Sequence, residues 1–177
     1  DVKAIAAGYY GHSLALYSPR PTIATVPSSL SFGDVALGSS RIDSVKVKNP
    51  GMTDLSASAI AVSGADAVLF TVTPSTLTVA AGDSAYVRIV FTPTTTGNFS
   101  AVLQLTHNAS GSPSQVALTG TGTVPVIELS TSALFMGTMS PGVTRVDSVK
   151  VKNTGTATLS VSAATVTGAD AGRFTAT

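Results

Sequence analysis

A tandem duplication constrains this sequence more than any other feature. The heptapeptide DSVKVKN occurs at Asp43–Asn49 and again at Asp147–Asn153, so the second copy begins 104 residues after the first. When this offset is held without gaps, residues 21–73 align with residues 125–177, and 27 of the 53 aligned positions are identical. Similarity at a fixed period indicates that one structural unit is used more than once.

The repeat divides the chain into three segments. Residues 21–124 form one unit, residues 125–177 repeat its N-terminal half, and residues 1–20 lie outside the repeat. A unit of about 100 residues has the size of a single domain. We therefore predict one whole domain at 21–124, the N-terminal half of a second domain at 125–177, and a separate short segment before them.

Apolar and polar residues alternate in short stretches of the first unit, which is the period of a β-strand. Val87, Ile89 and Phe91 share one side of such a stretch, and we expect Ile42, Val45 and Val47 to form the apolar side of another. Gly, Pro, Asn and Asp stand between the stretches and favour turns, and no window shows a sustained helical period. The predicted strands are a first strand broken into Thr22–Val26 and Leu30–Phe32, followed by Arg41–Lys48, Leu55–Val62, Leu69–Val72, Leu77–Val79, Tyr86–Phe91, Phe99–Thr106 and Val116–Thr119.

The composition suits such strands and excludes several kinds of partner. Charged residues make up 11% of the chain and the net charge is +1, so we predict no nucleic-acid partner. No apolar run reaches the ~18 residues of a membrane helix, so we predict no membrane insertion. The absence of cysteine excludes disulfides and thiolate sites. Since Asp1-Val2-Lys3 does not begin a signal peptide, we expect that a signal has been removed or that the chain is an internal fragment.

Six motifs of the first unit resemble the ASH/Hydin-type immunoglobulin-like module of bacterial choice-of-anchor D surface proteins. They are LSFGDVALG at Leu30–Gly38, SVKVKNPG at Ser44–Gly51, SGADAVLF at Ser63–Phe70, YVRIVFTP at Tyr86–Pro93, TGNFSAVLQL at Thr96–Leu105 and VALTGTG at Val116–Gly122. The resemblance covers all of the first unit and the front half of the second. It implies a β-sandwich and an extracellular, multi-module bacterial protein, located at the cell surface.

The segment before the repeat has a resemblance of its own. VKAIAAGYYGHSLAL at Val2–Leu16 looks like the closing part of an RCC1-type propeller repeat, although Gly11 departs from the family's spacing. The alternative is a strand of local structure. The predicted fold class is therefore all-β: tandem immunoglobulin-like β-sandwiches, the second incomplete, preceded by a lone propeller-like β segment.

Residues with catalytic or metal-binding chemistry are few. His12 and His107 are the only imidazoles, neither has an acid at metal-ligand spacing, and no serine stands in a G-x-S-x-G context. Asp66 and Asp170 occupy the same repeat position, where a Ca²⁺ ligand is one reading and an Asx-type turn closing onto the following Phe is the favoured one. We predict no catalytic, cofactor-binding or metal site, no cofactor and no small-molecule substrate.

Two other patterns have a chemical and a structural interpretation. Lys46 and Lys48, with their copies Lys150 and Lys152, suggest an isopeptide cross-link to an asparagine, but they alternate with valines and so should face solvent, where they discourage edge-to-edge aggregation. The sequences at Asn98–Ser100 and Asn108–Ser110 match the glycosylation sequon. In a bacterial protein we interpret them as chance matches.

The leading functional hypothesis is a structural or adhesive module, not an enzyme, that acts as a stalk or fibre component of a secreted bacterial protein. A second hypothesis is a protein- or glycan-binding module, for which Tyr9, Tyr10 and Tyr17 are the only aromatic grouping. A third places catalysis in a propeller upstream of Asp1. An incomplete sandwich and an orphan strand at Val2–Leu16 could also pair between copies of the chain, giving a filament by strand donation.

Overall fold

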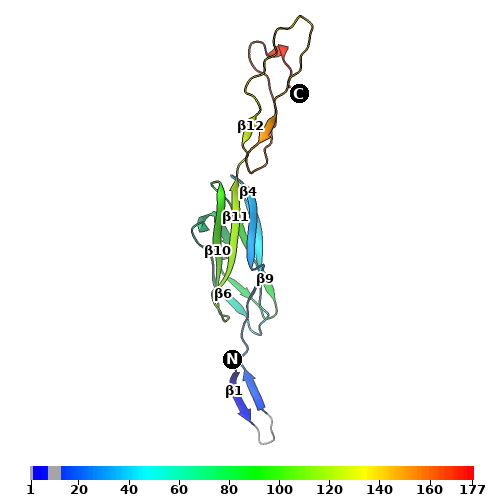
Figure 1. The fold of residues 1–177 in the computed structure, drawn as a ribbon. Coiled ribbons are helices and arrows are strands. Elements are labelled where there is room, and N and C mark those ends of the chain that lie inside the picture. Colours follow the sequence, from blue (N-terminus) through cyan, green and yellow to red (C-terminus); the bar gives the residue numbers. More distant parts are fainter. Residues whose placement is uncertain (1, 8–12) are drawn as a thin grey trace. The chain divides into compact units, whose positions relative to one another are not determined.

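The computed structural model describes residues 2–7 and 13–177 (Figure 1). The chain divides into two compact units, Asp1–Gly122 and Thr123–Thr177. At the start of the first unit, β1 (Val2–Ala7) pairs antiparallel with β2 (Ser13–Tyr17). The expectation of a single orphan strand is therefore wrong, because two strands satisfy each other's backbone N–H and C=O groups, which one strand cannot do. Tyr9, Tyr10, Gly11 and His12 lie outside the described residues.

Residues 24–123 form an immunoglobulin-like β-sandwich of two sheets. One sheet has the strand order β4-β11-β10-β6-β8 and the other has the order β3-β5-β9-β7. The predicted strand positions of the first unit are confirmed, with ends that move by a few residues. The two pieces of the predicted broken first strand are separate strands, because β3 and β4 lie in different sheets. The elements are β3 (Ala24–Val26), β4 (Ser29–Ala36), β5 (Arg41–Lys48), β6 (Leu55–Ser63), the short 3-10 helix η1 (Ala67–Leu69), β7 (Phe70–Thr73), β8 (Leu77–Val79), β9 (Ser84–Phe91), β10 (Gly97–His107) and β11 (Ser114–Thr123).

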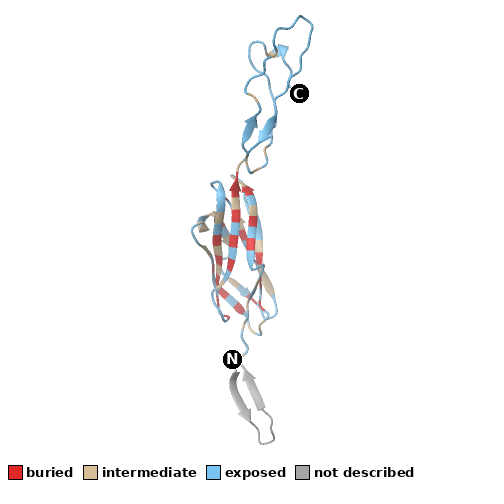
Figure 2. Ribbon diagram, in the orientation of Figure 1, coloured by how far each residue is buried: buried red, intermediate tan, exposed pale blue. Residues whose placement is uncertain are grey.

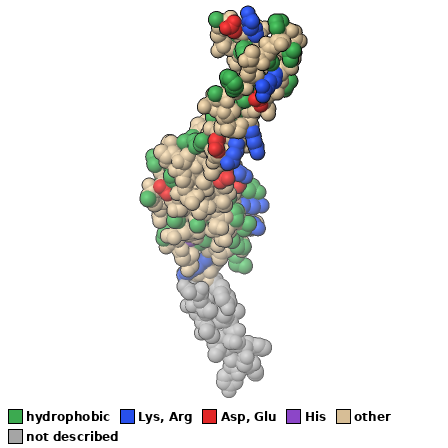
Figure 3. Space-filling model, turned by 45° about the horizontal axis from the view of Figure 1, so that its top comes forward, with side chains coloured by type: hydrophobic (Ala, Val, Ile, Leu, Met, Phe, Trp, Pro, Cys, Tyr) green, Lys and Arg blue, Asp and Glu red, His purple; other side chains and the backbone are tan. Residues whose placement is uncertain are grey.

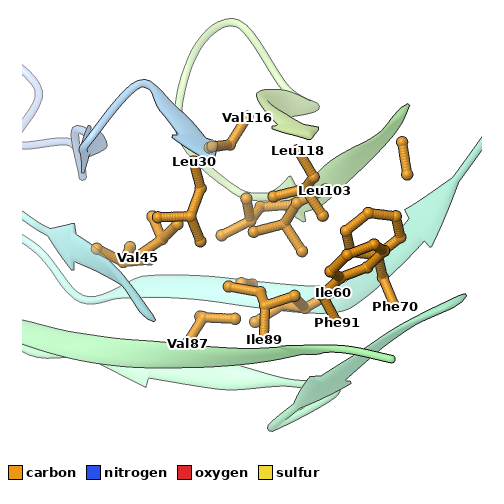
Figure 4. Packing of buried hydrophobic residues seen from close by; sticks show 14 of the residues in the cluster. Leu30, Val45, Ile60, Phe70, Val87, Ile89, Phe91, Leu103, Val116 and Leu118 are labelled. Carbon is orange, nitrogen blue, oxygen red and sulfur yellow. The ribbon is translucent and has the colours of Figure 1, made fainter. Parts of the chain in front are cut away.

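The alternation in the sequence becomes alternation in burial, which Figure 2 shows as bands along the strands. Val87, Ile89 and Phe91 of β9 are completely buried between the sheets, and Figure 4 shows the packing around them. The prediction that Ile42 joins Val45 on the buried side of β5 is wrong, because Ile42 is 56% exposed. The two residues are an odd number of positions apart, so a strand places them on opposite faces.

Aromatic rings fill one part of this core. The Phe91 ring stacks on Phe70 at a centroid distance of 4.8 Å and lies 5.7 Å from Phe32 and 6.1 Å from Phe99. Rings at such distances add about 0.5–1.5 kcal/mol per pair to the free energy of burial. Among the described residues there is no helix with the length and apolar character needed to cross a membrane.

The second unit has very little regular structure. Its elements are β12 (Ile127–Leu129), which pairs antiparallel with β13 (Val151–Asn153), and the 3-10 helix η2 (Ala171–Arg173). None of the residues from Val124 to Thr177 is buried (Figure 2). These residues do not form a sandwich by themselves, so a second immunoglobulin-like domain stays a prediction.

Strand order in the first unit explains this difference. Within residues 21–73, β3 pairs with β5, but β4, β6 and β7 have as sheet neighbours only β8, β9, β10 and β11, which come later in the chain. Residues 125–177 repeat only residues 21–73. The one ladder that can form within such a segment is the β3–β5 ladder, and β12–β13 is its repeat counterpart.

Candidate interaction surfaces

The residue that follows β5 is a completely buried asparagine. Asn49 is 0% exposed, and its Oδ1 accepts hydrogen bonds from the backbone N–H groups of Thr22 (3.2 Å) and Gly51 (3.1 Å). Its Nδ2 donates to three backbone carbonyls, at 2.8, 3.0 and 3.2 Å: those of Thr53, Val79 and Ala80. One side chain thus joins the segment that enters the sandwich, the turn after β5 and the loop before β9.

The glycine two residues later permits a close backbone crossing. A Cβ atom on Gly51 would lie 2.5 Å from the carbonyl oxygen of Arg20 and 2.5 Å from the nitrogen of Thr22. That carbonyl accepts a hydrogen bond from Met52 N at 3.1 Å. From the sequence, Asn49, Pro50 and Gly51 are expected only to form a turn. The recurrence of Asn-x-Gly at Asn153–Gly155 is the signal that indicates a more specific role.

Asn153, the repeat counterpart of Asn49, makes part of the same network. Its Oδ1 accepts from Val126 N (3.2 Å) and Gly155 N (3.0 Å), and its Nδ2 donates to the Ala157 carbonyl (2.7 Å). The residues that would correspond to Val79 and Ala80 are not part of residues 125–177, and Asn153 is exposed. The second copy therefore forms the half of the network that its own residues supply.

The apolar positions of the second copy show the same pattern. Phe70, Val45 and Val47 are 4%, 0% and 0% exposed in the sandwich, whereas their counterparts Phe174, Val149 and Val151 are 52%, 37% and 47% exposed. Leu134, the counterpart of the buried Leu30, is also exposed. We call this set (Leu134, Val149, Val151 and Phe174) the open core set. It has the spacing of a sandwich core and lacks the strands that would cover it.

His107 ends β10 and is a structural part of the loop to β11. Its Nδ1 accepts a hydrogen bond from Ala109 N (3.2 Å), and its Nε2 lies 2.9 Å from Ser114 Oγ. The residue is 7% exposed, and burial lowers the pKa of the imidazole below its ordinary value of 6.5. The neutral ring is thus the form that this loop stabilises.

We expect the stability of the sandwich to fall as the pH drops through about 6.5. Because the pKa of His107 is lowered in the folded state, the unfolded chain binds more protons just below pH 6.5 and the free energy of unfolding decreases there, whereas it is unaffected at higher pH. Urea midpoints at pH 8, 7, 6 and 5 should show this decrease in the wild type and a smaller one in His107→Gln. Equal decreases in both proteins would contradict the assignment, since His12 is present in each.

The carboxylate of Asp66 has a different partner from the one expected. The turn onto Phe70 is present, with Leu69 N donating to the Asp66 carbonyl, but the side chain accepts a hydrogen bond from Ser100 N on β10 at 2.9 Å. The carboxylate of Asp170 forms an ion pair instead, with its Oδ1 3.5 Å from Arg173 Nε. Within the described residues no three His, Cys, Asp or Glu side chains come together as metal ligands.

The remaining candidates are the repeated lysines and the two sequon asparagines. Lys48, Lys150 and Lys152 are exposed, and the Lys46 ammonium lies 5.6 Å from the centre of the Tyr86 ring. The idea that these lysines protect a sheet edge is wrong for the first copy, because β5 is an inner strand of its sheet.

The side chains of both sequon asparagines make hydrogen bonds within the sandwich. Asn98 Oδ1 accepts a hydrogen bond from Thr121 Oγ1, and Asn108 Oδ1 accepts one from Ser56 N.

Two open hollows on the first unit have volumes of about 330 and 610 Å³. Neither is lined by a carboxylate or an imidazole. The smaller one is lined by Ser31, Gly33, Asn98, Phe99, Ser100, Thr119, Gly120 and Thr121. Their linings therefore offer no pair of groups for acid–base chemistry.

Residues 21–115 match the family model described as abnormal spindle-like microcephaly-associated, ASPM-SPD-2-Hydin, or ASH. The match spans more than half of the chain. The chain belongs to the ASH family. The resemblance to an ASH-type module expected from the six motifs is thus confirmed, and the sandwich of residues 24–123 is called the ASH sandwich below. A comparison with curated protein sequences found no match.

Several solved structures are similar to the ASH sandwich. A Porphyromonas gingivalis W83 protein of unknown function is 12% identical, with a TM-score of 0.51 over 63% of this chain and 57% of that one. The ASH/PapD-like domain 7 of human CEP192 is 16% identical, with a TM-score of 0.48 over 60% and 89%. The Salmonella enterica SafA pilin in complex with the SafB chaperone gives 15% identity and a TM-score of 0.44 over 57% and 54%. At these identities the likeness concerns the fold alone.

Proposed function

We propose that this chain is a structural, protein-binding part of a secreted bacterial surface protein, in which it acts as a stalk or fibre component and not as an enzyme. The observation that carries the proposal is the tandem arrangement, in which a sandwich of the ASH family is followed in the same chain by a second copy of its first half. The open core set marks the side chains of that copy that further strands, of this polypeptide or another, would cover. Side chains with the spacing of a sandwich core are stabilised when a polypeptide supplies the missing strands and removes them from water. The resemblances to choice-of-anchor D proteins and to an RCC1-type repeat at residues 2–16 support an extracellular, multi-module parent protein.

The topology specifies which strands the partner must supply. In the ASH sandwich β10 and β11 lie between β4 and β6, and β9 lies between β5 and β7. Because β8 is also a neighbour of β6, the strands that complete residues 125–177, from this polypeptide or another, must be equivalent to β8, β9, β10 and β11. Residues 74–124 of this chain are a sequence of that kind.

A fusion that places a copy of residues 74–124 after Thr177 tests the proposal. We expect a second cooperative unfolding transition, together with slow amide hydrogen exchange in residues 125–177. A second fusion should carry Met136→Phe, Met139→Val, Val161→Ala and Ala164→Ile as well, which restores the core residues of the first copy. If residues 125–177 exchange as an unfolded chain does in both fusions, the proposal is wrong.

A second candidate function is a filament in which one copy donates strands to the next. It is favoured by the unpaired counterparts of β4, β6 and β7 in residues 125–177, because unpaired strands are templates for pairing with another chain. Since β1 and β2 already pair with each other, donation by residues 2–16 would add a hairpin and not one strand. Negative-stain electron microscopy of the 177-residue chain at high concentration should show filaments, and a monomer at every concentration would contradict strand donation.

A further inference from the structure

The outward face of the sheet β3-β5-β9-β7 has an unusual charge composition. The chain as a whole has 10 Lys and Arg against 9 Asp and Glu, but this face has three cations and no carboxylate. Its residues alternate with the buried ones: Ala24, Val26, Ile42, Ser44, Lys46, Lys48, Thr71, Thr73, Ser84, Tyr86, Arg88 and Val90. Figure 3 shows cationic and hydrophobic side chains gathered along one margin of the sandwich.

Strand register places the three cations in a line. Lys48 is opposite Ser84, Lys46 is opposite Tyr86, and Arg88 is opposite Ser44, so the cations occupy three successive outward rungs of β5 and β9. Successive outward rungs are about 6.6 Å apart along a strand. The basic line (Lys48, Lys46 and Arg88) therefore extends about 13 Å.

An exposed aromatic ring stands beside the middle of this line. Tyr86 is 61% exposed, its ring lies under the Lys46 ammonium at 5.6 Å, and Arg88 follows it two residues later on the same face. A tyrosine ring combines an apolar body with a hydroxyl group that can donate or accept hydrogen bonds. The neighbouring outward residues Ser44, Thr71 and Thr73 are short and polar, so they leave the ring and the cations accessible.

The cations of the basic line have no acidic partner among the described residues. The nearest acids along the chain, Asp43 and Asp83, accept hydrogen bonds from the backbone of Ser44 and Ser84. The second copy differs: Lys152, the counterpart of Lys48, is opposite Glu128 and lies 3.5 Å from its carboxylate. Ala24 stands in the first copy where Glu128 stands in the second.

We propose that the basic line and Tyr86 bind an anionic polysaccharide, a linear sugar polymer bearing carboxylate or sulfate groups, laid along the strands. Regularly spaced cations match regularly spaced anions, and the ring supplies a contact for the face of a sugar. An acidic protein fits less well, because two of the three cations are lysines and the centres of protein interfaces are depleted in lysine. The site lies wholly on the ASH sandwich, so it does not depend on whether residues 125–177 acquire strands.

Affinity measurements with the 177-residue chain test this proposal, using heparin and polygalacturonate as anionic probes, neutral dextran as the uncharged one and poly-glutamate as the acidic peptide. We expect binding to both anionic polysaccharides that weakens steeply with salt, and no binding to dextran. Lys46→Gln, Lys48→Gln and Arg88→Gln combined should weaken binding about tenfold or more, while Lys150→Gln with Lys152→Gln should change it less than twofold.

Two further variants distinguish binding at this site from nonspecific attraction between a basic protein and an anionic polymer. Ala24→Glu should weaken binding several-fold, because it gives Lys48 the partner that Lys152 has. Tyr86→Ala should weaken binding to the polysaccharides and leave unchanged the weaker, charge-driven binding that we expect for poly-glutamate. Circular dichroism and urea midpoints check that each variant is folded. The proposal is overturned if the wild type binds neither anionic polysaccharide, if the triple variant binds as the wild type does, or if Tyr86→Ala does not distinguish sugar from peptide.

Discussion

Replacing Asn49 by Asp should lower the free energy of unfolding of the ASH sandwich by about 3–5 kcal/mol. The substitution keeps the shape of the side chain, but it turns a donor that faces the carbonyls of Thr53, Val79 and Ala80 into a negatively charged acceptor in a completely buried position. Protonation of the new carboxyl restores one donor, so the deficit should shrink at low pH. Urea denaturation followed by circular dichroism at pH 7 and pH 5 measures both effects.

The repeat supplies the control for this variant. Asn153→Asp changes the same residue of the second copy, which is exposed, and should alter the unfolding transition of the sandwich by less than about 0.5 kcal/mol. Equal effects of the two substitutions would mean that residues 125–177 contribute to the same cooperative unit. A deficit below about 1 kcal/mol for Asn49→Asp would mean that the buried network does not hold the turn as described.

Phe70→Ala should also lower the free energy of unfolding of the ASH sandwich by about 3–5 kcal/mol. The ring is 4% exposed, stacks on Phe91 at 4.8 Å and lies 5.8 Å from Phe32, so truncation leaves a cavity between rings that the sheets hold in place. Calorimetry or urea denaturation of the 177-residue chain measures the loss.

Phe174→Ala is the matched variant of the second copy. Because Phe174 is 52% exposed, we expect a change of less than about 0.5 kcal/mol. In the fusion that supplies residues 74–124 after Thr177, the same substitution should become strongly destabilising for the second transition. A large effect of Phe174→Ala in the unfused chain would contradict the exposed state of the open core set.

The strands of the sandwich could be predicted from the sequence because a strand with one buried face has an apolar residue at every second position. β9 and β10 are examples, since Val87, Ile89 and Phe91, and then Ala101, Leu103 and Leu105, are all buried as their alternation indicates. The prediction for Ile42 was wrong because the position of a residue in the alternation, and not its apolar character, decides which face of the strand it occupies. Apolar residues on a strand are not all buried.

The polar contacts could not be predicted in the same way. The partners of Asn49 include Val79 and Ala80, about 30 residues along the chain, and the partner of the Asp66 carboxylate is Ser100, 34 residues along. Such pairs are decided by which strands become neighbours. The basic line had the same difficulty: the sequence indicates that Lys46 and Lys48 face outward, but only the register of β5 with β9 places Arg88 beside them.

The strand order of the ASH sandwich also determines when its sheets can form during synthesis of the chain. Since β4, β6 and β7 have as sheet neighbours only strands that come later in the chain, the first half of a unit leaves the ribosome before any strand that can cover it. At about 5–20 residues per second, the next ~50 residues take roughly 3–10 s to appear. A unit under synthesis therefore exposes the apolar side chains of its first half until its later strands have been made.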